Sequence, residues 1–106
     1  NQPRSGNKGR KLTKMSIDGR IRTMKVLLGR EAQRQAAELP KIVRARLYGV
    51  LERLKRWPEV SGAKPMRGEL AGHYRLRTGD YRILFRVDGD RVLVERIGHR
   101  DRFYDG

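Results

Sequence analysis

The sequence predicts an α+β fold, in which an N-terminal strand and a helical hairpin pack on one face of a small antiparallel sheet. Two observations predict this class. Between residues 30 and 56 the apolar residues recur with helical spacing, and from His73 onward their period changes to two, which is typical of strands. Helices that precede a run of strands in one chain favour separate helical and sheet layers.

One strand and two helices are expected before residue 60. The apolar run 25–28 predicts a short strand, and the alanine-rich segment 30–39 predicts a helix. Pro40 separates it from a second helix at 41–56, which ends at Trp57 because a residue before proline leaves the helical conformation. One apolar stripe marks the buried side of this second helix: Val43, Leu47, Val50, Leu51 and Leu54.

A loop and a three-stranded meander make up the second half. Residues 59–72 contain three glycines and a proline and are expected to form the loop. Strands are predicted at 73–78, 81–87 and 91–97. The connecting Thr-Gly-Asp and Asp-Gly-Asp segments are typical of tight hairpin turns, so the three strands are expected to be antiparallel neighbours.

Positive charge is the strongest feature of the composition. The chain has 26 Lys and Arg against 12 Asp and Glu, a net charge of +14. Residues 1–23 hold seven basic residues and one acidic residue with little apolar content, which predicts a flexible basic arm before a patterned domain at 24–106. The alternatives are an extension, a linker or a solvated tail with no function of its own. The domain is basic on its own, and such a field favours a polyanionic partner.

Several function classes are disfavoured by what the chain lacks. It has no cysteine and only two histidines, so neither a disulfide nor a structural metal site is expected, and no cofactor motif is recognisable. No apolar run of membrane-spanning length occurs, and no apolar core follows the basic N-terminus. The expectation is a cytoplasmic protein with no membrane contact.

Three arginines are predicted to share one face of the meander. In a strand alternate side chains point the same way, so Arg75 and Arg77 lie opposite Tyr74 and Leu76. By the same alternation Arg82 lies opposite the apolar set of its strand. If the apolar faces pack on the helices, the three guanidinium groups converge on the uncovered face and repel one another. A phosphate site is the favoured interpretation, and neutralisation by nearby carboxylates is the alternative.

Linked motifs in residues 64–104 resemble the RelE/ParE toxin superfamily, in particular its RelE-like branch. They are a K-P-x-x-G loop, a Y-R-x-R strand, a G-D-Y-R turn, and I-G-H-R followed by a tyrosine four residues later. The strand–helix–helix order before them also agrees, so the resemblance covers about residues 24–104. It implies the toxin of a bacterial type II toxin-antitoxin system that cleaves messenger RNA in the ribosomal A site without a metal.

The resemblance also implies a set of site residues and partners. The partners are a cognate antitoxin, the ribosome with its messenger RNA, and operator DNA bound by the toxin–antitoxin pair. Lysines often occupy the first two positions of the family's site, so the arginines found here are a departure that leaves the general base open. The implied catalytic residues are Arg75, Arg77, Arg82, His99, Arg100 and Tyr104.

The chemistry of these side chains suggests how they divide the work. Arginine stays protonated and binds phosphate oxygens with two parallel hydrogen bonds, so the arginines suit charge stabilisation and not proton abstraction. His99 is the best candidate for general base or acid, and the alternative is a strand-end histidine bonded to the backbone. Tyr104 would position the nucleotide or serve only packing. His73, beside the arginines, is expected to be a partly exposed strand residue.

Two other functions fit the same residues. A ParE-like relative would inhibit gyrase and cleave nothing, and a non-catalytic module would bind nucleic acid through the arm and the basic face. Loss of the basic set is expected in the gyrase inhibitors, and this sequence retains it.

Overall fold

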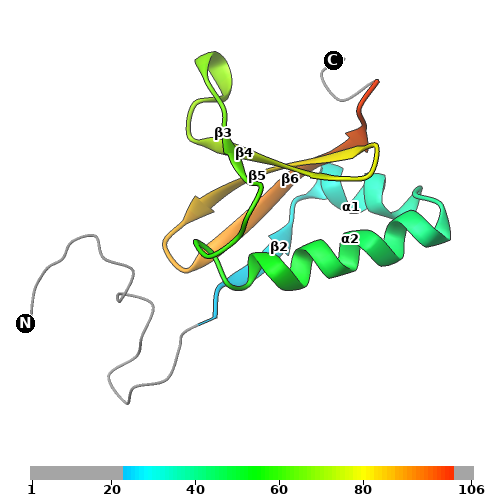
Figure 1. The fold of residues 1–106 in the computed structure, drawn as a ribbon, viewed down its shortest axis with the longest axis horizontal. Coiled ribbons are helices and arrows are strands. Elements are labelled where there is room, and N and C mark those ends of the chain that lie inside the picture. Colours follow the sequence, from blue (N-terminus) through cyan, green and yellow to red (C-terminus); the bar gives the residue numbers. More distant parts are fainter. Residues whose placement is uncertain (1–22, 102–106) are drawn as a thin grey trace, which may run out of the picture.

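A five-stranded sheet carries two helices on one face in the computed structural model, which describes residues 23–101 (Figure 1). The predicted arm, apart from its last residue, and Tyr104 lie outside the described residues. The elements in chain order are β2 (Lys25–Leu28), α1 (Arg30–Ala37), α2 (Lys41–Leu54), β3 (Lys64–Pro65), the short 3₁₀ helix Gly68–Leu70, β4 (His73–Thr78), β5 (Tyr81–Asp88) and β6 (Arg91–His99). The α+β class and the helices on one face of the sheet are confirmed.

The sheet is mixed, so the predicted antiparallel sheet is wrong at one edge. The strand order is β2-β6-β5-β4-β3, and β2 runs parallel to β6 while the remaining neighbours are antiparallel. Parallel neighbours need a long connection. The helical hairpin and most of the meander provide it here, because they lie between β2 and β6 in the chain (Figure 1). Strand periodicity predicts which residues face the core, but not which strands pair.

Several element boundaries also differ from the prediction. The expected loop 59–72 contains the two-residue strand β3, which pairs with β4 at the edge of the sheet, a position that tolerates its proline. Both helices end two residues earlier than predicted, at Ala37 and Leu54. Strand β6 continues two residues further, to His99.

The core lies between the helices and the inner face of the sheet. The predicted stripe of α2 contributes Leu47, Val50 and Leu54, and α1 contributes Ala32 and Ala36. From the strands come Leu76, Ile83, Phe85, Val92, Val94 and Ile97. Trp57 closes this core at the end of α2, with its ring edge-on to those of Tyr74 and Phe85, so it serves packing. Neither helix in the described part of the chain is long and apolar enough to cross a membrane.

Two glutamines of α1 complete the sheet where β2 ends. The amide of Gln33 donates to the carbonyl oxygen of Leu28 at 2.9 Å, and the amide oxygen of Gln35 accepts from the backbone N–H of Ile97 at 2.7 Å. Strand β6 extends beyond β2, so its N–H groups there have no strand neighbour to accept them. An unpaired buried N–H is costly, and Gln35 removes that cost at Ile97.

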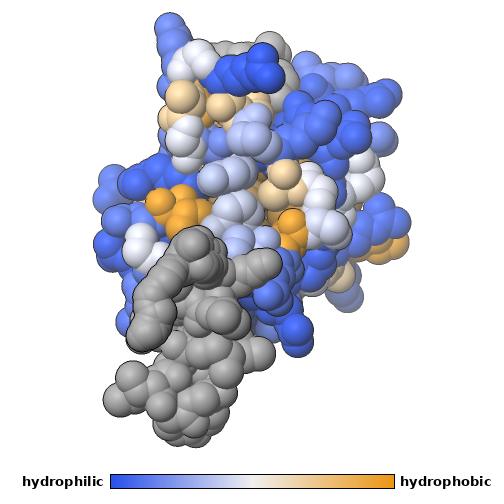
Figure 2. Space-filling view, turned by 60° about the vertical axis from the view of Figure 1, so that its left-hand side comes forward, coloured by the Kyte–Doolittle hydropathy of each residue, from blue (hydrophilic) through white to orange (hydrophobic). Residues whose placement is uncertain are grey.

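The outer surface is dominated by polar and charged residues. Figure 2 shows hydrophilic residues over most of the face it presents, with apolar patches that stay small and separated. This arrangement fits a domain whose apolar residues are largely used by one core.

One exposed residue of α2 lowers the stability of the free chain. Gly49 lies inside the helix, and a Cβ atom there would meet nothing within 4 Å. Glycine in a helix interior costs about 1 kcal/mol relative to alanine. We therefore expect Gly49→Ala to raise the thermal midpoint by about 4 °C or more, measured by circular dichroism. An unchanged or lower midpoint would show that the fold itself requires glycine there.

Candidate phosphate-binding site

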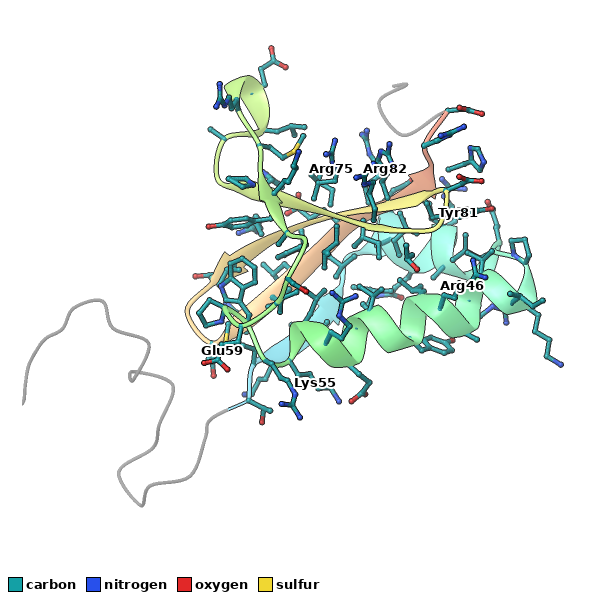
Figure 3. All side chains as sticks on the ribbon, viewed as in Figure 1. Arg46, Lys55, Glu59, Arg75, Tyr81 and Arg82 are labelled. Carbon is teal, nitrogen blue, oxygen red and sulfur yellow. The ribbon has the colours of Figure 1, made fainter. Side chains whose placement is uncertain are left out.

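Three arginines occupy one face of the β4–β5 hairpin. Arg77 and Arg82 are cross-strand partners, and Arg75 lies two residues before Arg77 on the same side of β4. Directly opposite residues of an antiparallel pair have Cβ atoms about 5 Å apart, and diagonal ones about 7–8 Å. Figure 3 shows Arg75 and Arg82 pointing away from the helices, as the strand alternation predicted. The three guanidinium groups therefore lie within reach of one small anion.

No carboxylate in residues 23–101 forms an ion pair with Arg77 or Arg82. On its other side, Arg82 pairs with Gly98 of β6, which has no side chain that could neutralise it. Like charges directly opposite in a sheet destabilise it, and nothing in the described structure relieves this pair. The alternative of internal neutralisation therefore fails for these two arginines. Arg75 does have a partner and is half-buried.

A fourth cation approaches this end of the sheet from the helical layer. The β4–β5 turn contains Gly79, whose φ of 62° suits glycine, and a Cβ there would lie 3.1 Å from the guanidinium of Arg46 on α2 (Figure 3). The same turn holds Arg100 in place, since the carbonyl oxygen of Asp80 accepts its backbone N–H at 2.7 Å. Positive charge thus surrounds the turn from both faces. Sequence reasoning missed Arg46 because it belongs to a different element.

A carboxylate stands at the other end of the same face. Glu95 accepts hydrogen bonds from His73 Nε2 at 2.8 Å and from Arg86 Nε at 2.5 Å, which joins three strands. Glu95 is the extra residue of a β-bulge in β6, because Leu84 pairs with Arg96 and Phe85 pairs with Val94. The bulge turns its side chain toward the arginine face. Glu95 neutralises Arg86, whereas Arg77 and Arg82 at the other end of the face have no ion pair with a residue in 23–101.

The ionised form of Glu95 is favoured in the folded chain. Burial by itself raises the pKa of this carboxyl group, but the hydrogen bonds from Arg86 and His73 together outweigh that effect, so its pKa lies below the ordinary value of 4.5. Glu95 therefore stays charged at neutral pH and keeps the network intact.

Two further predicted site residues, His99 and Arg100, lie at the end of the sheet. His99 is the partner of Tyr81 and alternates with Gly98, so its ring lies on the helical side, 5.3 Å from the Tyr81 ring, and not on the arginine face. Its Nδ1 accepts the backbone N–H of Asp101 at 3.2 Å. The Arg100 side chain is exposed, with Asp101 3.7 Å away. Tyr104 lies outside the described residues.

The histidine on the arginine face is instead His73, which has the same strand parity as Arg75 and Arg77. Its side chain is only 19% exposed, so the expectation of a partly exposed strand residue is confirmed. No group of three or more histidine, aspartate or glutamate side chains within residues 23–101 is arranged to hold a metal ion. The site is thus one of arginines, with a single histidine–carboxylate pair beside it.

Comparison with known proteins identifies the family. The model described as ParE toxin of type II toxin-antitoxin system, parDE, matches residues 26–104. The chain belongs to this toxin family. Toxin RelG of Mycobacterium tuberculosis is 39% identical over 67 residues, which cover 61% of this chain and 76% of that protein. Toxin RelE3 of Methanocaldococcus jannaschii is 29% identical over 85 residues, which cover 77% and 97%.

Solved structures agree with these relatives. The toxin–antitoxin complex RelBE2 of M. tuberculosis contains a chain with a TM-score of 0.66 and 33% identity, and the match covers 74% of this chain and 92% of that one. The isolated RelE toxin of E. coli, at 21% identity and a TM-score of 0.61 over 72% of this chain and 83% of its own, shows the shared fold. The chain is a RelE-type toxin, and the resemblance seen in its motifs is confirmed.

The arginine pair makes a prediction about the free toxin. Arg77→Gln removes one of two opposed charges, so we expect it to stabilise the fold by about 0.5 kcal/mol at low salt, measured by urea unfolding. The gain should shrink at high salt, where repulsion is screened. The control is Arg91→Gln, which removes the same charge from an arginine 3.1 Å from Asp88. A stabilisation of equal size in both variants would refute the local repulsion.

The Glu95 network makes a prediction about acid stability. A lowered carboxyl pKa adds stability above the unfolded value near 4.5, and this stability is lost as the pH falls through the lower folded value. We expect Glu95→Gln to unfold more easily at pH 7, by no more than about 1 kcal/mol because the group is partly exposed. The difference from the wild type should vanish well below pH 4.5 in thermal scans. A difference that is independent of pH would contradict this account.

Proposed function

We propose that this toxin is an endoribonuclease that cleaves messenger RNA in the ribosomal A site and so inhibits translation in the cytoplasm. The observation that carries the proposal is the pair Arg77 and Arg82, opposed across two strands and without a carboxylate partner among the described residues. Unrelieved positive charge on an exposed sheet face is what a phosphodiester would neutralise. The relatives named RelE and RelG support the same class of toxin.

The arginines would supply the electrostatic part of the reaction. When a 2′-hydroxyl attacks the adjacent phosphorus, negative charge grows on the non-bridging oxygens. Guanidinium groups fixed on a rigid sheet can stabilise that charge without reorganising. We assign this role to Arg75, Arg77 and Arg82, with Arg100 at the end of the sheet. The same positive field favours the ionised 2′-oxygen, so that solvent water can accept the 2′-hydroxyl proton without a strong general base on the protein.

His99 is proposed as the group that protonates the leaving 5′-oxygen. Its Nδ1 faces the backbone N–H of Asp101, so in the neutral ring the proton resides on Nε2. In the protonated ring Nδ1 would face the Asp101 carboxylate, 3.5 Å away, and Nε2–H would be the acid. Because the leaving 5′-oxygen belongs to the same phosphodiester that the arginines bind, this role requires the His99 ring to turn around the end of β6 toward the arginine face when RNA binds. Tyr104 is proposed to stack on or orient the nucleotide.

The proposed partners follow from this role. An antitoxin would bind the toxin and hold it inactive, and several structural neighbours are toxin–antitoxin complexes. The ribosome would supply the message, and the toxin–antitoxin pair would bind operator DNA. No cofactor or metal enters the proposed reaction.

The test is translation of a defined message in a cell-free system, with primer extension to map cuts. We expect cuts within ribosome-bound codons and little cleavage of free RNA. Arg82→Gln should lower the cleavage rate by at least about 100-fold, since a lost transition-state donor costs that much, while its circular dichroism stays that of the wild type. Arg91→Gln, the matched control at the far end of β6, should cleave normally.

Other results would point elsewhere. Intact messages at micromolar toxin, together with loss of supercoiling by gyrase, would favour the ParE-like activity. If His99→Gln cleaves at the wild-type rate with the same pH profile, His99 has no part in proton transfer.

A further inference from the structure

Helix α2 carries apolar residues on the side that faces away from the core. The exposed fractions of Ile42 and Tyr48 are 71% and 55%, and these are two of the three large hydrophobic residues that the described part of the chain leaves exposed. Single exposed apolar residues are common on protein surfaces. Two on one helix, both directed outward, suggest a surface that is covered in another state of the protein.

The outward residues form a second stripe with helical spacing. Ile42, Ala45 and Gly49 are exposed and follow the pattern i, i+3, i+7, with Tyr48 beside them. They lie across the helix from Leu47, Val50 and Leu54, which are buried in the core. The same line of the helix continues at Glu52, which is charged and exposed, so the uncharged part of the solvent side is limited to Ile42, Ala45, Tyr48 and Gly49. All four of these residues are exposed, so the stripe is accessible.

Gly49 makes no contact in the described part of the chain that requires glycine. Its position is helical and a Cβ atom there would meet open space, so neither backbone conformation nor internal packing calls for glycine. Glycine is a poor helix former, and alanine would suit the free chain better. The absence of a side chain at the centre of an apolar stripe allows another backbone to approach α2 closely, as small residues do where helices cross.

Charge decides what kind of chain fits there. The exposed residues Lys41 and Arg53 border the stripe, and the one acidic residue beside it, Glu52, is already paired with Lys55 at 2.9 Å. A second copy would bring like charges together across the contact, and each chain has a net charge of +14. An acidic chain would instead be attracted, and its own apolar residues would cover the stripe.

We propose that the outward face of α2 (Ile42, Ala45, Tyr48 and Gly49) is a docking surface for an acidic amphipathic helix, supplied by the antitoxin. The identification of this partner rests on the proposed function, whereas the surface itself does not. Contact across Gly49 would anchor the antitoxin on the helical layer, away from the arginine face. The acidic remainder of the antitoxin could then reach the RNA site at high effective concentration.

The test uses the full-length toxin and, as the probe, the protein encoded beside its gene, with affinity measured by calorimetry. Gly49→Leu fills the stripe without touching the fold, so its thermal midpoint should not fall, yet binding should weaken by at least tenfold. Ala37→Leu is the matched control, because it adds the same side chain at an exposed position of α1. It should bind within twofold of the wild type. Ile42→Ser should weaken binding as Gly49→Leu does.

The outcomes separate this proposal from the proposed function. Free Gly49→Leu toxin should still cleave messages at the wild-type rate, but should resist neutralisation by the antitoxin. Equal affinity of the wild type and Gly49→Leu for the neighbouring protein, or no binding to either, overturns the docking surface. A wild-type dimer in sedimentation that Gly49→Leu dissociates would identify a second copy as the occupant and overturn the antitoxin assignment. Failure of the wild type to cleave RNA would refute the nuclease alone.

Discussion

The opposition of Arg77 and Arg82 across the β4–β5 hairpin is the constraint around which the molecule is organised. Two like charges on neighbouring strands repel, and the free chain holds them together only because their strands are fixed from behind. That support is the core side of the same strands, where Leu76 and Ile83 are buried against the helices. Hydrophobic burial on one face of the sheet thus maintains unfavourable electrostatics on the other. Sites in enzymes commonly combine such local instability with a rigid frame.

The sheet topology explains why this arrangement is stable. Strand β6 lies between β2 and β5, and its parallel pairing with β2 joins the first element of the domain to the last. The bulge in β6 then brings Glu95 to the arginine face, where it neutralises Arg86 but does not pair with Arg77 or Arg82. The position of Glu95 therefore divides the basic face into two parts. The part with Arg86 is neutralised within the fold, and the part with Arg77 and Arg82 is available to an anion.

Much of the fold could be predicted because it depends on local patterns. A period of two placed Arg75, Arg77 and Arg82 on one face correctly, and the helical period identified the buried stripe of α2. The parallel edge and the bulge depend on contacts between distant segments, which periodicity does not encode. His99 shows the same limit. Its place in a motif suggested a shared site with the arginines, but the alternation along β6 puts its ring on the opposite face.

Helix α2 shows how one element can serve two requirements that conflict. For the free toxin, alanine or a charged residue at position 49 would give a better helix, and exposed apolar residues at 42 and 48 bring no internal contact. A sequence shaped by folding alone would remove all three. Their presence on the solvent side of one helix is explained if the toxin spends much of its existence bound, because a partner that covers these residues stabilises the complex. In that view two unfavourable features of this small domain are each relieved by a different partner. They are the opposed charges of Arg77 and Arg82 and the exposed apolar stripe of α2.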